Sequence, residues 1–301
     1  DNQSVEQPIY ALKLNYILHG RYLIGRVLGQ GGFGITYVGL DMVLDIKVAV
    51  KEYFPMGLVT RDNMSSELLW NASQVGSTQR QSGCESFLKE ARKMAKTDAN
   101  PTIVRVRDTF LENETAYIIM DFVEGHTLKK KLQQGGPIPF PECMQLLRPM
   151  MEGLKEVHHQ GIIHRDISPD NIIIQPDGSV KLLDLGAAKD MTASNGQTSQ
   201  VVAKKGFSPL EQYVEKGEVG TWTDVYALCA TIYYCITGKV LPDALERMYG
   251  EQQLQIPETV DPLPEHVVHT LEAGLAIKVQ DRIQNIEELL QRLDSQQNQP
   301  S

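Results

Sequence analysis

A glycine cluster near the start of the chain, at residues 29–34, restricts the fold through the residues that follow it. In a dinucleotide-binding fold, the last glycine of such a cluster opens a helix. Here residues 35–40 are rich in β-branched and aromatic side chains, which predict a strand. The glycines therefore join two strands, and their backbone N–H groups could lie over phosphates because no side chains intervene. A purely structural hairpin turn is the alternative.

An apolar segment further along the chain, Val48-Ala49-Val50-Lys51, ends on a lysine. Such a lysine is either a phosphate ligand or a solvated charge at a sheet edge. Glu90 follows in a segment where Phe87, Ala91 and Met94 repeat at helical spacing. Glu90 either faces inward or forms surface pairs, which would contribute only about 0.3 kcal/mol.

A third cluster, His164-Arg165-Asp166-Ile167-Ser168-Pro169-Asp170-Asn171, is followed by Asp184-Leu185-Gly186. Asp166 could accept the proton of a hydroxyl, and Asn171 and Asp184 carry the hard oxygen atoms that Mg²⁺ prefers. Each residue alone is more often a turn residue that bonds its own backbone. Their order after the glycines and Lys51 favours phosphoryl transfer, which needs a positioned hydroxyl and cations that spread the developing charge.

Together these residues resemble the eukaryotic-like (bacterial) serine/threonine protein kinase family over about residues 22–293. The resemblance implies that the glycine-rich loop covers ATP, that Lys51 holds the phosphates and that Glu90 holds Lys51. It makes Asp166 the catalytic base and assigns Mg²⁺ to Asn171 and Asp184. The residues that it places at ATP are Gly29, Gln30, Gly31, Gly32, Phe33, Gly34, Ala49, Lys51, Met120, Asp121 and Val123. Met120 is equally a core residue that closes a strand.

The chain departs from the family pattern at the catalytic loop. Ser168 stands where serine/threonine kinases carry a lysine, and a serine supplies a hydrogen bond but no charge. Counting back from Glu211 places Lys204 where the family has a threonine that contacts the same neighbourhood. We hypothesise that Lys204, or Lys205 if the register slips by one residue, replaces the missing charge. The alternative is that both lysines are solvated loop charges.

Further resemblance concerns structural anchors and regulation. Glu211 and Arg282 match a buried ion pair of the family, and Asp224 matches an aspartate that accepts N–H groups from the catalytic loop. Arg165 marks a catalytic loop of the type that often waits for a phosphate on the activation segment. The candidate phosphate acceptors there are Thr192, Ser194, Thr198 and Ser199. Leu185 replaces the usual phenylalanine and should still pack on the Glu90 helix.

The pattern of strands and helices predicts an α+β fold with two lobes. Residues 1–21 would be an N-terminal extension and residues 22–293 the kinase domain, with a β-rich N-lobe at 22–120, a hinge at 121–125 and a helical C-lobe at 126–293. Residues 294–301 are a polar tail or linker. Compared with the family that the chain resembles, residues 52–83 look like an insertion between the third strand and the helix. Trp70 within it either packs onto the lobe or is exposed for a partner.

Composition excludes several other classes. The net charge of −9 argues against nucleic-acid binding, which normally needs a basic face. The four cysteines form no metal or redox motif and are expected to be reduced and buried. The longest apolar run, residues 225–237, contains polar residues and is too short to span a membrane, so we expect a buried core helix. We expect a cytoplasmic domain, which could be the cytosolic portion of a longer, membrane-anchored protein.

The resemblance predicts an enzyme that uses ATP and Mg²⁺ to phosphorylate Ser/Thr hydroxyls of protein substrates, including its own activation segment, and it allows a dimer for autophosphorylation. Two other functions stay open. A pseudokinase would keep the fold as a nucleotide-binding scaffold, which Ser168 and Leu185 support. A small-molecule phosphotransferase shares the aspartate-based loop, although Glu211, Asp224 and Arg282 belong to kinases with protein substrates.

Overall fold

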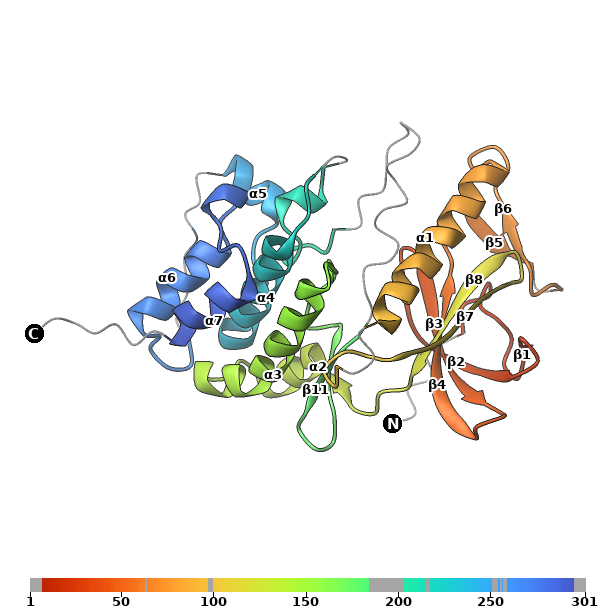
Figure 1. Cartoon of the computed structure of the whole chain (residues 1–301), viewed down its shortest axis with the longest axis horizontal. Coiled ribbons are helices and arrows are strands. Elements are labelled where there is room, and N and C mark those ends of the chain that lie inside the picture. The colour runs from red at the N-terminus through yellow and green to blue at the C-terminus, as the bar shows by residue number, and fades with distance from the viewer. Residues whose placement is uncertain are drawn as a thin grey trace, which may run out of the picture. The chain divides into compact units, whose positions relative to one another are not determined.

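A computed structural model describes residues 7–62, 64–96, 100–183, 203–214, 217–250, 254, 256 and 259–294, with the side chain of Glu90 excepted. The described chain forms two compact units (Figure 1). The N-lobe comprises the described residues up to 96 together with residues 104–123, and the C-lobe comprises residues 100–103 and those from 124 onward. A sheet-rich first unit and a helical second unit confirm the predicted fold class.

The N-lobe is built on a six-stranded antiparallel sheet with the strand order β1-β2-β3-β4-β8-β7. Its strands are β1 (Ile17–Leu18), β2 (Tyr22–Gly31), β3 (Gly34–Asp41), β4 (Ile46–Tyr53), β7 (Val106–Glu112) and β8 (Thr115–Asp121). The β2–β3 hairpin confirms that the glycine cluster joins two strands.

The two faces of this sheet carry different residues because side chains alternate along a strand. Val48 and Val50 of β4 point into a hydrophobic core and are fully buried. The chain before β2 covers this core with Leu12 and Leu18. Lys51, which follows Val50, therefore belongs to the opposite face.

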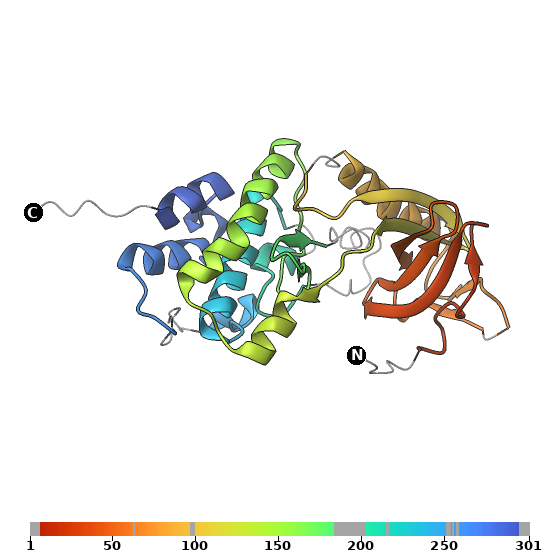
Figure 2. The ribbon, with the colours of Figure 1, turned by 90° about the horizontal axis from the view of Figure 1, so that it is seen from below.

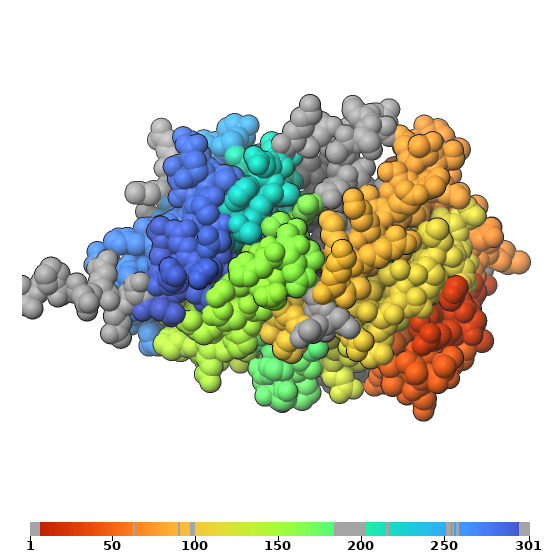
Figure 3. Space-filling model, viewed as in Figure 1, coloured from red at the N-terminus to blue at the C-terminus, as the bar shows by residue number. Residues whose placement is uncertain are grey.

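Helix α1 (Ser77–Ala95) packs along β7 and β8 on that opposite face (Figure 3). Phe87 and Ala91 of α1 are buried, as their helical spacing predicts. The helix begins well before residue 83, so the interval predicted as an insertion ends with the first turns of α1.

The rest of that interval contains a small two-stranded sheet of β5 (Val59–Arg61) and β6 (Leu68–Trp70). Trp70 donates its indole N–H to the carbonyl of Glu114 at 2.9 Å. Its ring also lies 6.0 Å from that of Tyr53. Trp70 therefore packs onto the N-lobe, which is the first of the two interpretations.

The C-lobe is mainly helical (Figure 2). Its helices are α2 (Leu128–Gly135), α3 (Phe140–His159), α4 (Thr221–Thr237), α5 (Ala244–Tyr249), α6 (Glu265–Gly274) and α7 (Ile286–Asp294). A small sheet has the order β11-β10-β9, with β9 (His126–Thr127), β10 (Ile172–Ile174) and β11 (Val180–Leu182). Helix α4 is buried almost all round, which explains its apolar sequence. Helix α3 continues through Pro149.

All four cysteines are buried and have free thiols, as expected. Burial raises the pKa of the Cys229 thiol to about 12, which keeps it protonated at neutral pH.

None of the helices in the described ranges combines the length and the apolar character that a membrane span requires.

Candidate active site

The glycine-rich loop is a tight hairpin whose last ladder pair joins Gly31 to Gly34. Gly32 and Phe33 form its tip. A Cβ atom on Gly34 would lie 2.8 Å from the carbonyl oxygen of Glu52 and 3.4 Å from Cε of Lys51. Gly34 is therefore required by the close approach of β4, and it leaves the Lys51 side chain room to extend past the loop.

Lys51 lies near the end of β4, opposite Thr36 of β3 and Ile118 of β8. Its ammonium nitrogen lies 5.8 Å from the centroid of the Phe87 ring, so the amine faces α1. Glu90 belongs to the same helix, three residues after Phe87. The described part of the structure thus brings Lys51 to the helix that carries Glu90, whose side chain lies outside the described residues.

The predicted adenine-binding residues adjoin the same face of the sheet. Ala49 pairs with Met120 across β4 and β8, and Met120 is buried. Asp121 ends β8 and donates its N–H to the carbonyl of Arg105 at 2.9 Å. Val123 follows and is half-buried.

In the C-lobe, the structure brings Asp166 and Asn171 together. The Asn171 side-chain amide donates to Oδ2 of Asp166 at 2.7 Å and to the Asp166 carbonyl at 2.8 Å. The backbone N–H of Asn171 donates to the Ser168 carbonyl at 3.0 Å, and its carbonyl accepts from Leu183 at 2.7 Å. These bonds fix the orientation of the half-buried Asp166 carboxylate and tie the loop to the residue that precedes Asp184.

Asp224 of α4 anchors the loop that carries Asp166, as the resemblance implied. One carboxylate oxygen accepts the N–H of Arg165 at 2.8 Å, and the other accepts the N–H of His164 at 2.7 Å. This arrangement holds Arg165 in the left-handed region, at φ = 68°.

His158 also reaches Asp224, with Nε2 lying 2.8 Å from Oδ2. Burial disfavours the charge of Asp224, but the bonds and charges of His158 and His164 outweigh it and lower the pKa of Asp224. The sequence analysis missed His158. Its position in the last turn of α3, just before the loop, could have indicated a contact with the loop or its anchor.

Ser168 and Lys204 meet in the structure. The Lys204 ammonium donates to the hydroxyl of fully buried Ser168 at 2.6 Å and lies 3.3 Å from Oδ2 of Asp170. Lys129, which the sequence analysis also missed, pairs with the other Asp170 oxygen at 3.0 Å. Lys205 instead pairs with Glu246 at the surface. Of the two candidate lysines, Lys204 is the one at the catalytic loop.

A tight turn presents Lys204 to the loop. The Lys204 carbonyl accepts the N–H groups of Phe207 and Ser208 at 2.9 Å each, and its own N–H donates to the Ser208 hydroxyl at 2.9 Å. Gly206 takes φ = 80°, and a Cβ there would lie 2.7 Å from the carbonyl oxygen of Leu241. The turn is therefore held firmly against the C-lobe.

The buried pair of Glu211 and Arg282 forms as the resemblance implied, with 2.6 Å between Nη1 and Oε1. Thr223 donates its hydroxyl to the same carboxylate at 3.0 Å. Next to Glu211, Gln212 donates its side-chain amide to the Arg165 carbonyl at 2.9 Å. This last contact, which the sequence analysis missed, ties the end of the activation segment to the catalytic loop.

Several predicted residues lie outside the described residues. Among them are the magnesium ligand Asp184, its neighbour Leu185 and the candidate phosphate acceptors Thr192, Ser194, Thr198 and Ser199.

The chain is similar to known proteins in sequence and in fold. Residues 22–292 match the model of the protein kinase domain family. Serine/threonine-protein kinase F of Synechocystis sp. is 30% identical over 272 residues, which cover 85% of this chain and 52% of that protein. Serine/threonine-protein kinase PrkC of Bacillus subtilis is 29% identical over 225 residues, covering 74% of this chain and 31% of PrkC.

A solved structure, PpkA-294 in its apo form, shares the fold with a TM-score of 0.80 and 32% identity. It covers 95% of this chain, and all of that structure is matched. The chain spans about half the length of the kinase from Synechocystis and less of PrkC.

Proposed function

Because the chain belongs to the protein kinase family, we propose that it transfers the γ-phosphate of ATP to Ser/Thr hydroxyls of proteins. The observation that carries the proposal is the joint presence of an oriented Asp166 carboxylate and a Lys204 ammonium at one catalytic loop. A base and a cation at the same loop serve the two needs of phosphoryl transfer, which are a positioned acceptor and neutralisation of charge.

In this proposal the N-lobe binds the nucleotide. The N–H groups of residues 29–34 would lie over the phosphates, Lys51 would hold the phosphate oxygens and Glu90 would hold Lys51. The Asp121 carbonyl and the Val123 N–H would bind the edge of adenine, with Met120 behind the ring. The alternation of β4 and β8 supports this assignment, because it places Lys51, Ala49 and Met120 on one face.

The C-lobe supplies the chemistry. Asp166 would orient the acceptor hydroxyl and accept its proton, and its fixed bonds to Asn171 hold it in place for that step. The Asn171 amide nitrogen makes both of these bonds, so its oxygen is the atom offered to a cation. Mg²⁺, held by Asn171 and Asp184, would neutralise charge on the phosphates.

Lys204 would take the task of the lysine that the family carries at position 168. Its ammonium is the group that Ser168 lacks, and the Ser168 hydroxyl holds it at 2.6 Å. A cation beside the catalytic loop stabilises the transferring phosphoryl group electrostatically. The exchange of the two residues therefore keeps the charge where transfer takes place and weakens the support that Ser168 gave to a pseudokinase.

The proposal is tested by incubating the chain with labelled ATP, Mg²⁺ and a generic protein substrate, with Asp166→Asn as the control. Label on protein that is lost in Asp166→Asn supports the kinase. Nucleotide binding without transfer would indicate a scaffold, and transfer only to metabolites would indicate a small-molecule phosphotransferase. Either of these results would overturn the proposal.

The chain would also phosphorylate its own activation segment in the cytosol, where ATP and Mg²⁺ are supplied, within a transient dimer. Arg165 supports this step, because an arginine beside the catalytic base can pair with a phosphate on that segment. Mass spectrometry after incubation with Mg²⁺ and ATP tests the idea. A fully active enzyme with an unmodified segment would contradict it.

A further inference from the structure

The segment before β2, residues 7–16, touches the strand that leads into the glycine-rich loop. The Gln7 side-chain oxygen accepts the N–H of Val27 at 2.9 Å, where the β2–β3 register shifts. The hydroxyl of Tyr10 exchanges two hydrogen bonds with the amide of Gln30, at 2.7 and 3.0 Å. Gln30 belongs to the glycine-rich loop, so the segment contacts the loop directly. We call residues 7–16 the brace.

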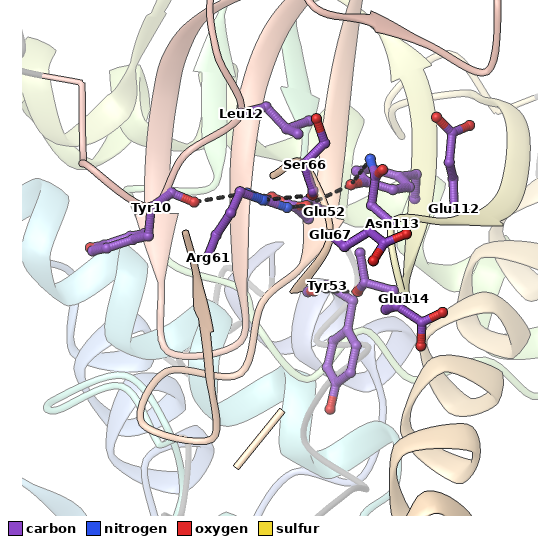
Figure 4. Close-up of polar contacts among 12 residues, drawn as sticks. Tyr10, Leu12, Glu52, Tyr53, Arg61, Ser66, Glu67, Glu112, Asn113 and Glu114 are labelled. Atoms are coloured by element: carbon purple, nitrogen blue, oxygen red, sulfur yellow. Dashed lines mark hydrogen bonds and ion pairs between the residues drawn. The ribbon is translucent and has the colours of Figure 1, made fainter. Parts of the chain in front are cut away.

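A buried arginine anchors the brace to the β5–β6 hairpin (Figure 4). Arg61 donates from Nη1 to the carbonyl of Tyr10 at 2.8 Å and from Nε to the carbonyl of Ser66 at 2.8 Å. Its guanidinium also forms an ion pair with Glu52. The side chains of Arg61 and Glu52 are 3% and 0% exposed, so neither charge can exchange its partner for water.

Glu52 extends this anchor across the sheet. Its carboxylate accepts the hydroxyl hydrogens of Tyr37 at 2.7 Å and Tyr117 at 2.6 Å. The Tyr37 oxygen in turn accepts the N–H of Leu12 in the brace at 3.1 Å. Because Glu52 directly follows Lys51, the brace and the phosphate-binding strand share one buried network.

The tip of the glycine-rich loop is held from its other side. Phe54 donates its N–H to the carbonyl of Phe33 at 2.8 Å, and Met56 donates to that of Gly32 at 2.9 Å. The Tyr10 ring stacks on Phe54 with 5.2 Å between centroids. The brace therefore contacts both the loop and the segment that holds its tip.

We propose that the brace pre-orders the glycine-rich loop for nucleotide, with Tyr10 as the positioning residue that acts through Gln30. This inference rests on the proposed function, because it assigns a regulator to the same ATP site. A loop that is ordered before binding loses less conformational entropy when it closes on phosphates. Releasing it should therefore weaken nucleotide affinity while leaving the chemical step largely unchanged.

The test compares Tyr10→Phe with the wild-type chain by calorimetric titration with Mg²⁺ and a non-hydrolysable ATP analogue. Tyr10→Phe keeps the stacked ring and removes the hydroxyl, and the loss of its two exposed hydrogen bonds with Gln30 predicts affinity weaker by about three- to tenfold. The value of kcat at saturating ATP should change less than about twofold. A merely structural role would not separate the two quantities in this way.

Tyr16→Phe is the matched control. Tyr16 lies in the same segment, but its hydroxyl donates to Glu112 and Asn113, away from the glycine-rich loop. It should bind the analogue like the wild type. Gln30→Ala should weaken binding as Tyr10→Phe does, and the double variant should be no weaker than the single ones.

Equal nucleotide affinity of Tyr10→Phe, Tyr16→Phe and the wild type would overturn the proposed role of the brace and leave the proposed kinase function intact. Additive losses in the double variant would also overturn it, because Tyr10 would then act independently of Gln30. A wild-type chain that binds no nucleotide would instead overturn the proposed function. Thermal unfolding of each variant identifies a loss of affinity that comes from misfolding, and the titrations are then made at a temperature at which Tyr10→Phe and Tyr16→Phe are both folded.

Discussion

The Lys204 ammonium donates a hydrogen bond of 2.6 Å to the hydroxyl of Ser168, across 36 residues of sequence. The resemblance to serine/threonine kinases predicts a lysine at position 168, and here a lysine from residue 204 lies beside the serine at that position. This contact supports the proposal that Lys204 supplies the positive charge that Ser168 lacks.

We predict that Lys204→Ala lowers kcat by about 100-fold, as the loss of one preorganised donor does in other enzymes. Ser168→Lys in the Lys204→Ala background should restore most of the loss, because it returns a cation to the same place. Steady-state kinetics of both single variants and the double variant check this. Free energies that simply add would show that the two residues have separate tasks.

Loss of Arg282 should destabilise the C-lobe strongly. Arg282→Met leaves the Glu211 carboxylate buried without its cation, which predicts a loss of about 3–5 kcal/mol in unfolding free energy. Arg148→Met is the matched control, because the Arg148 pair with Asp294 lies at the surface and should contribute less than about 1 kcal/mol. Urea denaturation measures both, and similar losses would contradict the prediction.

Asp224 should stabilise the fold in a pH-dependent way. Its pKa is lowered in the folded chain, so the folded state favours the carboxylate and the unfolded state takes up the proton first. Its contribution is therefore fully present above the unfolded pKa of about 3.8 and is lost as the pH falls through the lower, folded pKa. The stability difference between the wild type and Asp224→Asn should shrink below pH 4 in thermal unfolding. A constant difference from pH 7 to pH 3 would contradict this.

The turn that presents Lys204 can be tested through its glycine. Gly206→Ala should lower kcat, because a Cβ at φ = 80° would press on Leu241 and displace the turn. Gly178→Ala, at φ = 84° with nothing within 4 Å of the added Cβ, carries the same backbone strain of about 1 kcal/mol without the crowding. It should lose stability but not turnover. Equal turnover of the two variants would show that the position of the turn does not matter.

Local patterns predicted much of the fold. The β-branched residues after the glycines indicated the β2–β3 hairpin, and the apolar run that ends on Lys51 indicated β4. The periodicity around Phe87 located the middle of α1, although not its early start at Ser77. These elements depend on short-range alternation, which a single sequence displays directly.

Contacts between distant residues were harder to predict. The closeness of Lys204 to Ser168 could be anticipated only by counting back from Glu211 within the pattern of the kinase family. No sequence motif indicates the contacts of Gln212 with Arg165 and of Arg61 with Tyr10, because amides and arginines can bond many different partners. What decides them is the packing that buries them, and this emerges only once the sheets and helices have assembled.

The alternation of β4 sets Lys51 and Glu52 back to back on opposite sides of one sheet. A slip of one residue would exchange them, turning an acid toward the phosphates and an amine into the hydrophobic core. Arg61 would then face a like charge in a place that water cannot reach. The buried Glu52 carboxylate therefore stabilises only the native register of β4. A one-residue insertion or deletion in β4 should abolish folding and catalysis together.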